Sequence, residues 1–532
     1  MKKSSLLFII IVLAAATARA DLRLPAIISD HAMLQAGKPV AIWGWAEPGA
    51  RIAVNFVRQG SSQPEQTFTA TGDADGKWVG QLPALAAGAT GRLLITSDRD
   101  APKTIDDLVV GEVWLCGGQS NMVYDIEGKL GGDPNNPEEF VQIAYNISVA
   151  KQEAAAARPP IRYFEVARKG FAQPADVEGH WVQADSTNVQ NFSAVAWNFA
   201  VSLQNRLHAP VGLIVSCVGG TRVELWMSRQ TLHETSVGPT VVGRYDQLLA
   251  DMMPKLNAQR EATLKAWIAA NPTPELQSKN QGTRPGPIST ATFRNFPARL
   301  YNAMICRLEP YALRGVIWYQ ADGNIAHPSE YGELFQALIR EWRADWKEPL
   351  PFYFVEMNNM LKDKQTKPVE PNSLCLIREQ QHAGLLQPGV GMVASIDVGI
   401  KNPHFPNKKP VGERLGRMAL RDCYGQAVGE VNGPLYRGFR IEGSRVRLAF
   451  TAAEGLRVRG GGDLKGFAIR GSSGPWVWAS GKIDGPDIVV WSDQVPAPAA
   501  VRYAWAANPV ISVENAAGLP LYPFRTDTES KE

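Results

Sequence analysis

Between residues 107 and 426, short segments that are apolar along their whole length alternate with segments whose apolar residues recur at helical spacing. The apolar segments lie at 108–115, 211–215, 315–319, 351–355 and 392–396, and clear helical patterns lie at 194–207 and 331–346. A strand that is apolar on both sides must be covered on both faces, and helices between successive strands supply that cover. The alternation therefore predicts an α/β fold in which a parallel sheet lies between two layers of helices.

Two β-rich regions flank this central domain, which we expect to span residues 105–426. From 21 to 104, short alternating runs are separated by Gly, Pro and Asp turns, a pattern typical of a small β-sandwich. From 427 to 532, strand-like runs and frequent glycines predict a second β-module. Residues 228–296 form a predicted insertion in the central domain, which either frames a substrate cleft or is a solvated surface excursion.

The first twenty residues have the pattern of a signal peptide. Lys2 and Lys3 precede an apolar stretch at 6–16, and the small residues Ala18 and Ala20 suit a cleavage site. The apolar stretch is too short to span a bilayer, which disfavours the alternative of a membrane anchor. We therefore expect an exported protein, periplasmic or secreted, that has no membrane association after the signal is removed.

Charge and cysteine usage exclude several classes of function. The chain has 55 basic and 52 acidic residues without a long basic run, so neither nucleic acid nor an anionic membrane is an expected partner. The five cysteines are odd in number and widely spaced, which predicts buried free thiols without a disulfide framework. None of the seven histidines pairs with another at a metal-ligand spacing, so we expect no metal and no cofactor.

The run GGQSNM at 117–122 directly follows a predicted buried strand. Ser120 sits where backbone amides can converge on a reacting carbonyl oxygen, as a nucleophilic hydroxyl needs, or it merely caps the next helix. Gly219, Asp322 and Asp397 also follow predicted strands. Because active sites of parallel sheets lie beyond the carboxyl ends of the strands, we expect these four residues on one rim.

Four motifs follow one another along the chain. They are GQSNM at 118–122, GGT at 219–221, WYQADGN at 318–324, and His404 with NK at 407–408 and GERL at 412–415. In this order they resemble the characteristic blocks of the sialate O-acetylesterase family, which belongs to the SGNH hydrolase superfamily. Segments at 28–35 and 518–525 also resemble family segments, so the resemblance covers essentially the whole mature chain.

The resemblance implies an SGNH-type α/β/α hydrolase core and a serine mechanism without metal that removes acetyl groups from sugar hydroxyls. By family position, Ser120 attacks the acetyl carbonyl, while His404 accepts the serine proton and later activates water. The oxyanion donors are the backbone amides of Ser120 and Gly219 and the side-chain amide of Asn324, with Gly220 as the alternative to Gly219. Loss of one such donor typically costs about 3 kcal/mol of transition-state stabilisation.

The chain departs from the family where an aspartate usually orients the histidine. Asn402 and Lys401 stand two and three residues before His404, and neither supplies a negative charge. The equivalent loss in a serine protease lowers turnover roughly ten-thousandfold. Asp322, in a motif that usually carries glutamate, is the first candidate for a replacement acid and Asp397 the second. The other readings are a serine–histidine dyad or a weak enzyme.

The substrate is less defined than the chemistry. We expect Gln119, Arg222 and Gln320 to contact an acetylated carbohydrate, either a sialate or a plant-polysaccharide sugar. For Arg222 the alternative, which its residue type favours, is an exposed arginine without that role. Trp197, Trp226 and Trp318 lie near the motifs and either stack on sugar or pack in the core. Two other classes stay open: a carbohydrate-binding protein on a weakly active or inactive hydrolase scaffold, and a lipid or thioester hydrolase.

Overall fold

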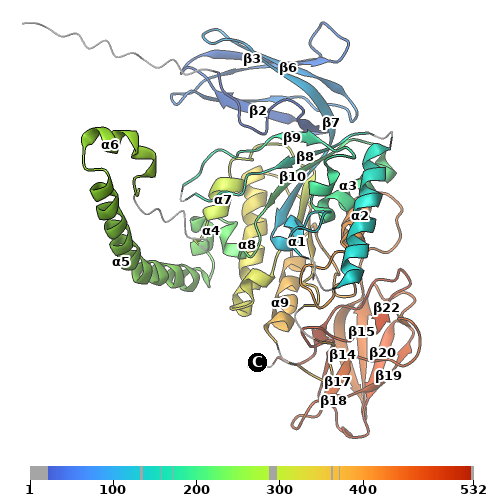
Figure 1. Ribbon diagram of the computed structural model, residues 1–532. Coiled ribbons are helices and arrows are strands. Elements are labelled where there is room, and N and C mark those ends of the chain that lie inside the picture. The colour runs from blue at the N-terminus through green and yellow to red at the C-terminus, as the bar shows by residue number, and fades with distance from the viewer. Residues whose placement is uncertain are drawn as a thin grey trace, which may run out of the picture.

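The structure, a computed structural model, describes residues 22–131, 136–156, 159–171, 173–286, 296–360, 363–370 and 372–528. An N-terminal β-module, an α/β centre and a C-terminal β-module follow one another in space as they do along the chain (Figure 1). The predicted signal peptide at 1–20 lies outside the described residues.

The centre of the molecule is a sheet with the strand order β13-β12-β11-β7-β10-β8-β9. Neighbouring strands are parallel, except that β9 is antiparallel to β8. The strands are β7 (Lys103–Gly118), β8 (Ile161–Glu165), β9 (Trp181–Gln183), β10 (Val211–Cys217), β11 (Gly315–Tyr319), β12 (Phe352–Val355) and β13 (Val390–Val393). β10 and β11 flank β7 and are buried along their whole length, so the predicted parallel sheet is confirmed.

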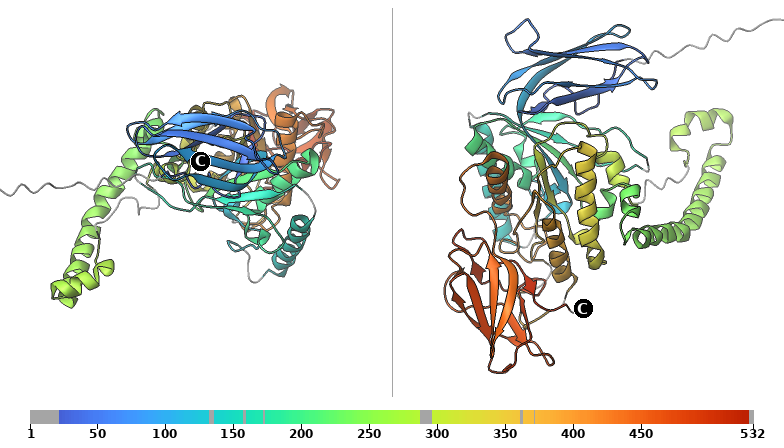
Figure 2. Two further views of the ribbon diagram at one scale, coloured as in Figure 1. Left: turned by 90° about the horizontal axis from the view of Figure 1, so that it is seen from above. Right: turned by 180° about the vertical axis from the view of Figure 1, so that it is seen from behind.

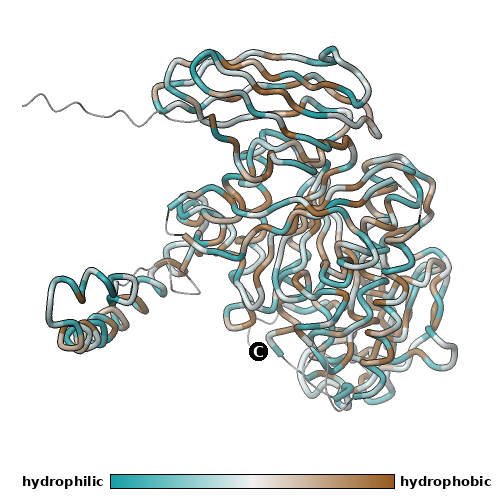
Figure 3. Tube along the Cα trace, turned by 45° about the horizontal axis from the view of Figure 1, so that its top comes forward, coloured by the Kyte–Doolittle hydropathy of each residue, from teal (hydrophilic) through white to brown (hydrophobic). Residues whose placement is uncertain are grey.

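Helices cover both faces of this sheet, as the alternating pattern predicts. Trp114 and Tyr353 pack with α3 and α10 on one face, while Leu115 and Trp318 pack with α8 and α9 on the other. Figure 3 shows apolar segments gathered along the central strands. The helices are α1 (Ser120–Val123), α2 (Pro137–Ala155), α3 (Ala194–Leu207), α4 (Arg229–His233), α5 (Gly238–Ala270), α6 (Pro274–Lys279), α7 (Arg299–Met304), α8 (Pro328–Trp346), α9 (Ser373–Gln381) and α10 (Lys409–Tyr424).

Two glycines let α10 approach α3 closely. A Cβ on Gly412 would lie 2.6 Å from the Cβ of Asn198, and a Cβ on Gly416 would lie 2.5 Å from the Oγ of Ser202. Both distances are too short for any real side chain, so these positions require glycine. Gly412, the first residue of the GERL motif, is therefore needed for the close packing of α10, the helix that follows the His404 loop.

β7 belongs both to the N-terminal module and to the central sheet. Its first half pairs with β6 and β1, and its second half, from Glu112 to Gly118, pairs with β10 and β11. The other N-terminal strands are β1 (Met33–Gln35), β2 (Val40–Trp45), β3 (Arg51–Arg58), β4 (Gln66–Thr71), β5 (Lys77–Leu82) and β6 (Thr90–Ser97). One continuous strand thus fixes the N-terminal module to the centre.

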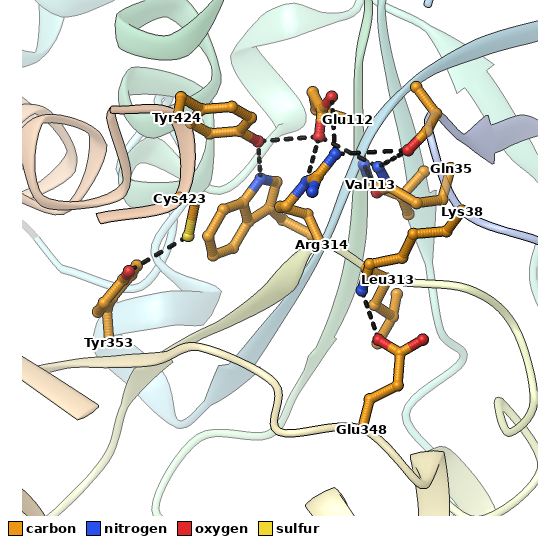
Figure 4. A network of polar contacts seen from close by, with 12 residues as sticks. Gln35, Lys38, Glu112, Val113, Leu313, Arg314, Glu348, Tyr353, Cys423 and Tyr424 are labelled. Carbon is orange, nitrogen blue, oxygen red and sulfur yellow. Dashed lines mark hydrogen bonds and ion pairs between the residues drawn. The ribbon is translucent and has the colours of Figure 1, made fainter. Parts of the chain in front are cut away.

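A polar network reinforces this junction (Figure 4). The Glu112 carboxylate accepts hydrogen bonds from Arg314 Nε at 2.7 Å, Tyr424 Oη at 3.0 Å and Gln35 Nε2 at 3.1 Å. Lys38 also reaches from the N-terminal module to the main-chain oxygen of Leu313 at 2.8 Å. The network lies at the amino ends of the central strands, opposite the predicted site.

The insertion at 228–296 begins on the body of the protein and then leaves it. Helix α5 projects away from the rest of the molecule in Figures 1 and 2. Its buried residues all lie in its first turns: Gly238, Val241, Val242 and Tyr245. In the described part of the insertion, the buried residues of α5 thus lie at its base, and the rest of α5 is a surface excursion.

The C-terminal module contacts the central domain near the carboxyl ends of the strands. The buried Arg378 side chain, on α9, donates to the main-chain oxygens of Ala506 and Ala507 at 2.8 and 2.9 Å. The strands of the C-terminal module are β14 (Leu435–Glu442), β15 (Arg445–Thr451), β16 (Arg457–Val458), β17 (Phe467–Arg470), β18 (Val477–Trp478), β19 (Ser480–Asp484), β20 (Asp487–Trp491), β21 (Ala500–Tyr503), β22 (Val513–Glu514) and β23 (Phe524–Arg525).

All five cysteines carry free thiols. Among the helices in the described ranges, none has the combination of length and apolar character that a membrane crossing requires.

Candidate active site

Ser120 lies in a sharp turn at the carboxyl end of β7, the strand at the middle of the sheet. Gly118, which ends β7, has a φ of +133°, and a Cβ there would lie 2.3 Å from the main-chain oxygen of Tyr319. The Gln119 amide donates to that same oxygen at 2.9 Å, and Ser120 then begins α1. Glycine is required because the turn combines a left-handed backbone with close contact to β11.

Gly219, directly beyond β10, lies against Ser120. A Cβ built on Gly219 would be 3.5 Å from the Cβ of Ser120, and the Val218 amide donates to the Gly118 oxygen at 3.1 Å. The structure thus brings together two residues that are a hundred positions apart in the chain. Since residue 219 has no side chain, the space beside the Ser120 side chain is left open to a small group.

Asn324 is the last residue of a short 3-10 helix, Asp322–Asn324, that follows β11. Its side chain holds two loops together through hydrogen bonds. Its Oδ1 accepts from the Val223 amide and from Gln320 Nε2, both at 2.9 Å, and its Nδ2 donates to Glu224 at 2.8 Å. Glu224 is 1% exposed and also accepts from the Tyr245 hydroxyl at 3.1 Å. This buried carboxylate was not among the predicted site residues, since nothing in its sequence neighbourhood marks it.

The three residues predicted to contact the substrate lie in two different environments. Gln119 and Gln320 are buried, and they bind main-chain groups of the other motif loops: Gln119 Oε1 accepts from the Gly323 amide at 3.2 Å, and Gln320 Nε2 donates to the Thr221 oxygen at 3.0 Å. Arg222 is 23% exposed and donates to the Tyr245 hydroxyl at 3.1 Å. Of the three, Arg222 is the one whose side chain reaches solvent.

The tryptophans near the motifs are core residues. Trp197 is 2% exposed and Trp226 is fully buried, so neither offers a face to a sugar ring. The packing interpretation of these residues is confirmed.

Asp322 carries a buried carboxyl group beside Asn324. Its Oδ1 atom is buried and has no hydrogen-bond partner, and burial raises the pKa of Asp322 to about 6. Two backbone amides, its own and that of Gly323, oppose this shift. In the described residues, no hydrogen bond or ion pair joins Asp322 to His404, so its role as the orienting acid stays a prediction.

His404 lies in the loop between β13 and α10. The neighbouring Gly131 packs so closely that a Cβ there would lie 2.6 Å from the Cβ of His404, and the main chain of Leu130 acts to raise the pKa of the ring. The His404 amide donates to Asn402 Oδ1 at 2.9 Å. Burial lowers the pKa of His404, and the nearby positive charge of Lys408 lowers it further.

The loop of His404 borders a cavity of about 620 Å³. Asn402 lines it, and its Nδ2 donates to Glu139 Oε2 at 3.2 Å. Glu139, on α2, is 5% exposed and is a second carboxylate that sequence reasoning missed. It reaches the histidine loop through Asn402, the residue that stands where the family usually has aspartate.

The Asp397 carboxylate forms ion pairs with two arginines. Both of its oxygens accept from Arg414 at 2.7 Å, and Arg459 of the C-terminal module lies 3.1 Å away. The carboxylate is fully buried, and this pairing with Arg414 holds the pKa of Asp397 below its ordinary range. The arginine of the GERL motif therefore has a structural partner, and Asp397 has no free oxygen to offer a histidine.

Ser120 and His404 make no hydrogen bond with each other in the described residues, but their neighbours are connected. Asn121 accepts a hydrogen bond from Lys408, four residues beyond His404. Around this site and throughout the described ranges, no group of three His, Cys, Asp or Glu side chains is arranged to hold a metal ion.

Known proteins resemble this chain over most of its length. A family model described as carbohydrate esterase, sialic acid-specific acetylesterase, matches residues 286–424. The sialate O-acetylesterases of Mus musculus and Homo sapiens are 26% and 25% identical over 82% and 88% of this chain, and the alignments cover 80% and 84% of those proteins. The crystal structure of a carbohydrate acetylesterase from Xanthomonas citri matches with a TM-score of 0.75 and 30% identity, over 96% of this chain and 100% of that one.

The fold and these matches define the protein as an esterase of the carbohydrate acetylesterase class. More narrowly, the chain belongs to the sialate O-acetylesterase family.

Proposed function

We propose that this protein is a serine esterase that removes O-acetyl groups from carbohydrates through an acetyl-enzyme intermediate. The observation that carries the proposal is the contact between Ser120 and Gly219 at neighbouring strand ends, with 3.5 Å between the Ser120 Cβ and a Cβ built on Gly219. Acyl transfer needs a hydroxyl with main-chain amides beside it, because negative charge develops on the carbonyl oxygen. A glycine at 219 also leaves room for an acetyl group.

In the proposed first step, the Ser120 oxygen bonds to the acetyl carbon and its proton passes to the His404 ring. The amides of Ser120 and Gly219, and the Asn324 side chain, donate to the oxyanion. The bond between the acetyl carbon and the sugar oxygen then breaks, and the sugar oxygen takes the proton from His404. Water, with His404 as base, hydrolyses the acetyl-enzyme and releases acetate.

We propose that the main-chain oxygen of Leu130 orients the His404 ring in place of the usual aspartate. In this role it would accept the ring N–H and thereby fix which nitrogen is free to act as base. The support is the effect of the Leu130 main chain on the pKa of His404 and the close packing of Gly131 against His404. A carbonyl dipole stabilises the imidazolium ion less than a carboxylate does, so turnover is expected to be lower than in relatives that keep the aspartate.

Asp322 is the better of the two candidate carboxylates. Its Oδ1 has no partner, whereas both oxygens of Asp397 bind Arg414. Asp322→Ala is therefore expected to lower kcat more than Asp397→Ala, measured side by side on p-nitrophenyl acetate with the folded fraction of each variant determined. Equal small losses would favour a Ser120–His404 dyad supported by Leu130 alone.

The proposed substrates are acetylated sialic acids or acetylated plant polysaccharides such as xylan and xyloglucan. Sialate recognition would draw on Arg222, because a guanidinium can bind a carboxylate through two hydrogen bonds. Arg222→Met should then raise KM for acetylated sialic acid without changing KM for acetylated xylo-oligosaccharides. Export through the predicted signal peptide would bring the enzyme to such extracellular polymers.

The test of the proposed function is Ser120→Ala, compared with Ser186→Ala at an exposed turn. Hydrolysis of p-nitrophenyl acetate should fall at least a thousandfold in Ser120→Ala and stay unchanged in Ser186→Ala. Activity that survives Ser120→Ala would refute the serine mechanism. Sugar binding without hydrolysis by the wild type would support the binding-protein alternative, and a preference for long acyl esters would support a lipid hydrolase.

A further inference from the structure

Lys408 is buried in an aromatic environment just before α10. The residue is 1% exposed, and its Nζ lies 3.5, 5.0 and 5.8 Å from the ring centres of Phe405, Tyr124 and Tyr319. Among the described residues, no carboxylate lies within ion-pair distance of this amine. A buried ammonium group without a counter-ion is unfavourable for folding, and an apolar side chain of the same length would avoid that penalty.

The amine of Lys408 has one hydrogen-bond acceptor, Asn121 Oδ1. Asn121 directly follows Ser120 and is 2% exposed. Its Nδ2 donates to Asn358 Oδ1 at 3.3 Å, in the loop after β12. Lys408 thus holds the residue next to the serine from one side while Asn358 holds it from the other.

Asn358 connects this series of hydrogen bonds, which we call the path, back to the loop that carries His404. Its Nδ2 lies 3.4 Å from the main-chain oxygen of Pro403, directly before His404. The path therefore leaves the histidine loop at Lys408, crosses the serine turn at Asn121 and re-enters the loop at Pro403.

The far end of the path is anchored to rigid structure. Asn358 is fully buried, and its main-chain oxygen accepts from Arg378 at 2.9 Å. Tyr319, the last residue of β11, donates to Asn358 Oδ1 at 3.1 Å. Because Arg378 also binds the C-terminal module, Asn358 is held both by β11 and by the junction with that module.

We propose that Lys408 is a positioning residue for the esterase reaction, which acts through Asn121 to hold the Ser120 turn against the His404 loop. This inference rests on the proposed roles of Ser120 and His404. Lys408 is buried beneath the turn, so its loss should change the alignment of the two groups and leave substrate affinity unaltered.

The test compares Lys408→Met, which keeps the length and packing of the side chain, with Lys409→Met at the adjacent, partly exposed lysine. On p-nitrophenyl acetate, Lys408→Met should lower kcat on the order of 10- to 100-fold, as for a misaligned catalytic group, with KM changed less than twofold. Lys409→Met should change neither constant. A rise in KM with unchanged kcat would overturn the proposal.

A double-mutant cycle tests whether Lys408 acts through Asn121. Asn121→Ala should lower kcat to a similar extent, and the double variant should lose no more than the poorer single variant. Losses that multiply would show that the two residues act independently and would overturn the proposal. Where Lys408→Met does not fold, Asn121→Ala and Asn358→Ala decide, because each removes two bonds of the same path. Wild-type kcat in both variants would be the contrary result.

The outcome separates this inference from the proposed function. If Ser120→Ala abolishes hydrolysis while Lys408→Met matches Lys409→Met, the serine mechanism stands and the positioning role of Lys408 is refuted. If Ser120→Ala remains active, both proposals fail.

Discussion

Replacement of Asp322 by asparagine should stabilise the protein in a pH-dependent way. Burial raises the pKa of this carboxyl group from its ordinary value of 3.8 to about 6 in the folded state. The folded state therefore holds the proton more tightly than the unfolded state. The carboxyl group has no unfavourable effect below pH 3.8 and its full effect above pH 6, where it disfavours folding by about 3 kcal/mol.

The pH dependence distinguishes the carboxyl group from other effects of the substitution. The same two pKa values give an unfavourable contribution of about 1.6 kcal/mol at pH 5 and about 3 kcal/mol at pH 8. Asp322→Asn should thus gain about 1.4 kcal/mol more stability at pH 8 than at pH 5, whatever its fixed effect on packing.

Urea unfolding followed by tryptophan fluorescence at the two pH values measures this difference. Ser186→Ala, at an exposed turn, is the control and should give the same stability change at both pH values, because it alters no titratable group. A stability change in Asp322→Asn that does not depend on pH would refute the raised pKa of Asp322. A fall in kcat in the stabilised variant would show that the carboxyl group serves turnover at the expense of stability.

Three further outcomes are expected. Gly118→Ala should destabilise the protein by about 1–3 kcal/mol through backbone strain. It should also lower kcat, because its Cβ would lie 2.3 Å from a main-chain oxygen of β11. Gly88→Ala is the control and should show only the strain, since Gly88 has a φ of +83° and a Cβ there would meet no atom within 4 Å. Arg414→Met should lower the free energy of unfolding by about 3–5 kcal/mol, since it leaves the buried Asp397 without its bidentate partner, and thermal unfolding would measure this. The acid limb of kcat/KM should lie below pH 6.5, because the pKa of His404 is lowered; a limb near pH 7 would contradict this.

The central sheet could be predicted because its strands are buried on both faces and are therefore apolar without interruption. β7 was predicted only in part, because its first five residues are exposed or partly exposed whereas its remaining residues are all buried. The edge strand β9 and its neighbour β8 were not predicted. β13 ends at Val393, three residues before the end of the predicted segment, because the last apolar residues of that segment pack in the core as a loop.

The site was predictable where its chemistry depends on side chains in compact motifs. Ser120, Gly219 and Asn324 could be chosen because short motifs mark them, and the structure places Ser120 beside Gly219. The partners of these residues come from distant segments and carry no such mark. A main-chain oxygen such as that of Leu130 has no sequence signature at all, because every residue has one.

Three energetically unfavourable features surround the Ser120 turn: the left-handed backbone of Gly118, the buried amine of Lys408 without a carboxylate partner among the described residues, and the unpaired Oδ1 of Asp322. A single substitution could remove either of the two buried polar groups without altering the sheet that carries them. Stability alone would favour such replacements, since buried polar groups without full partners disfavour folding. Their presence around one hydroxyl is therefore explained if the geometry of turnover, and not stability, determines these residues.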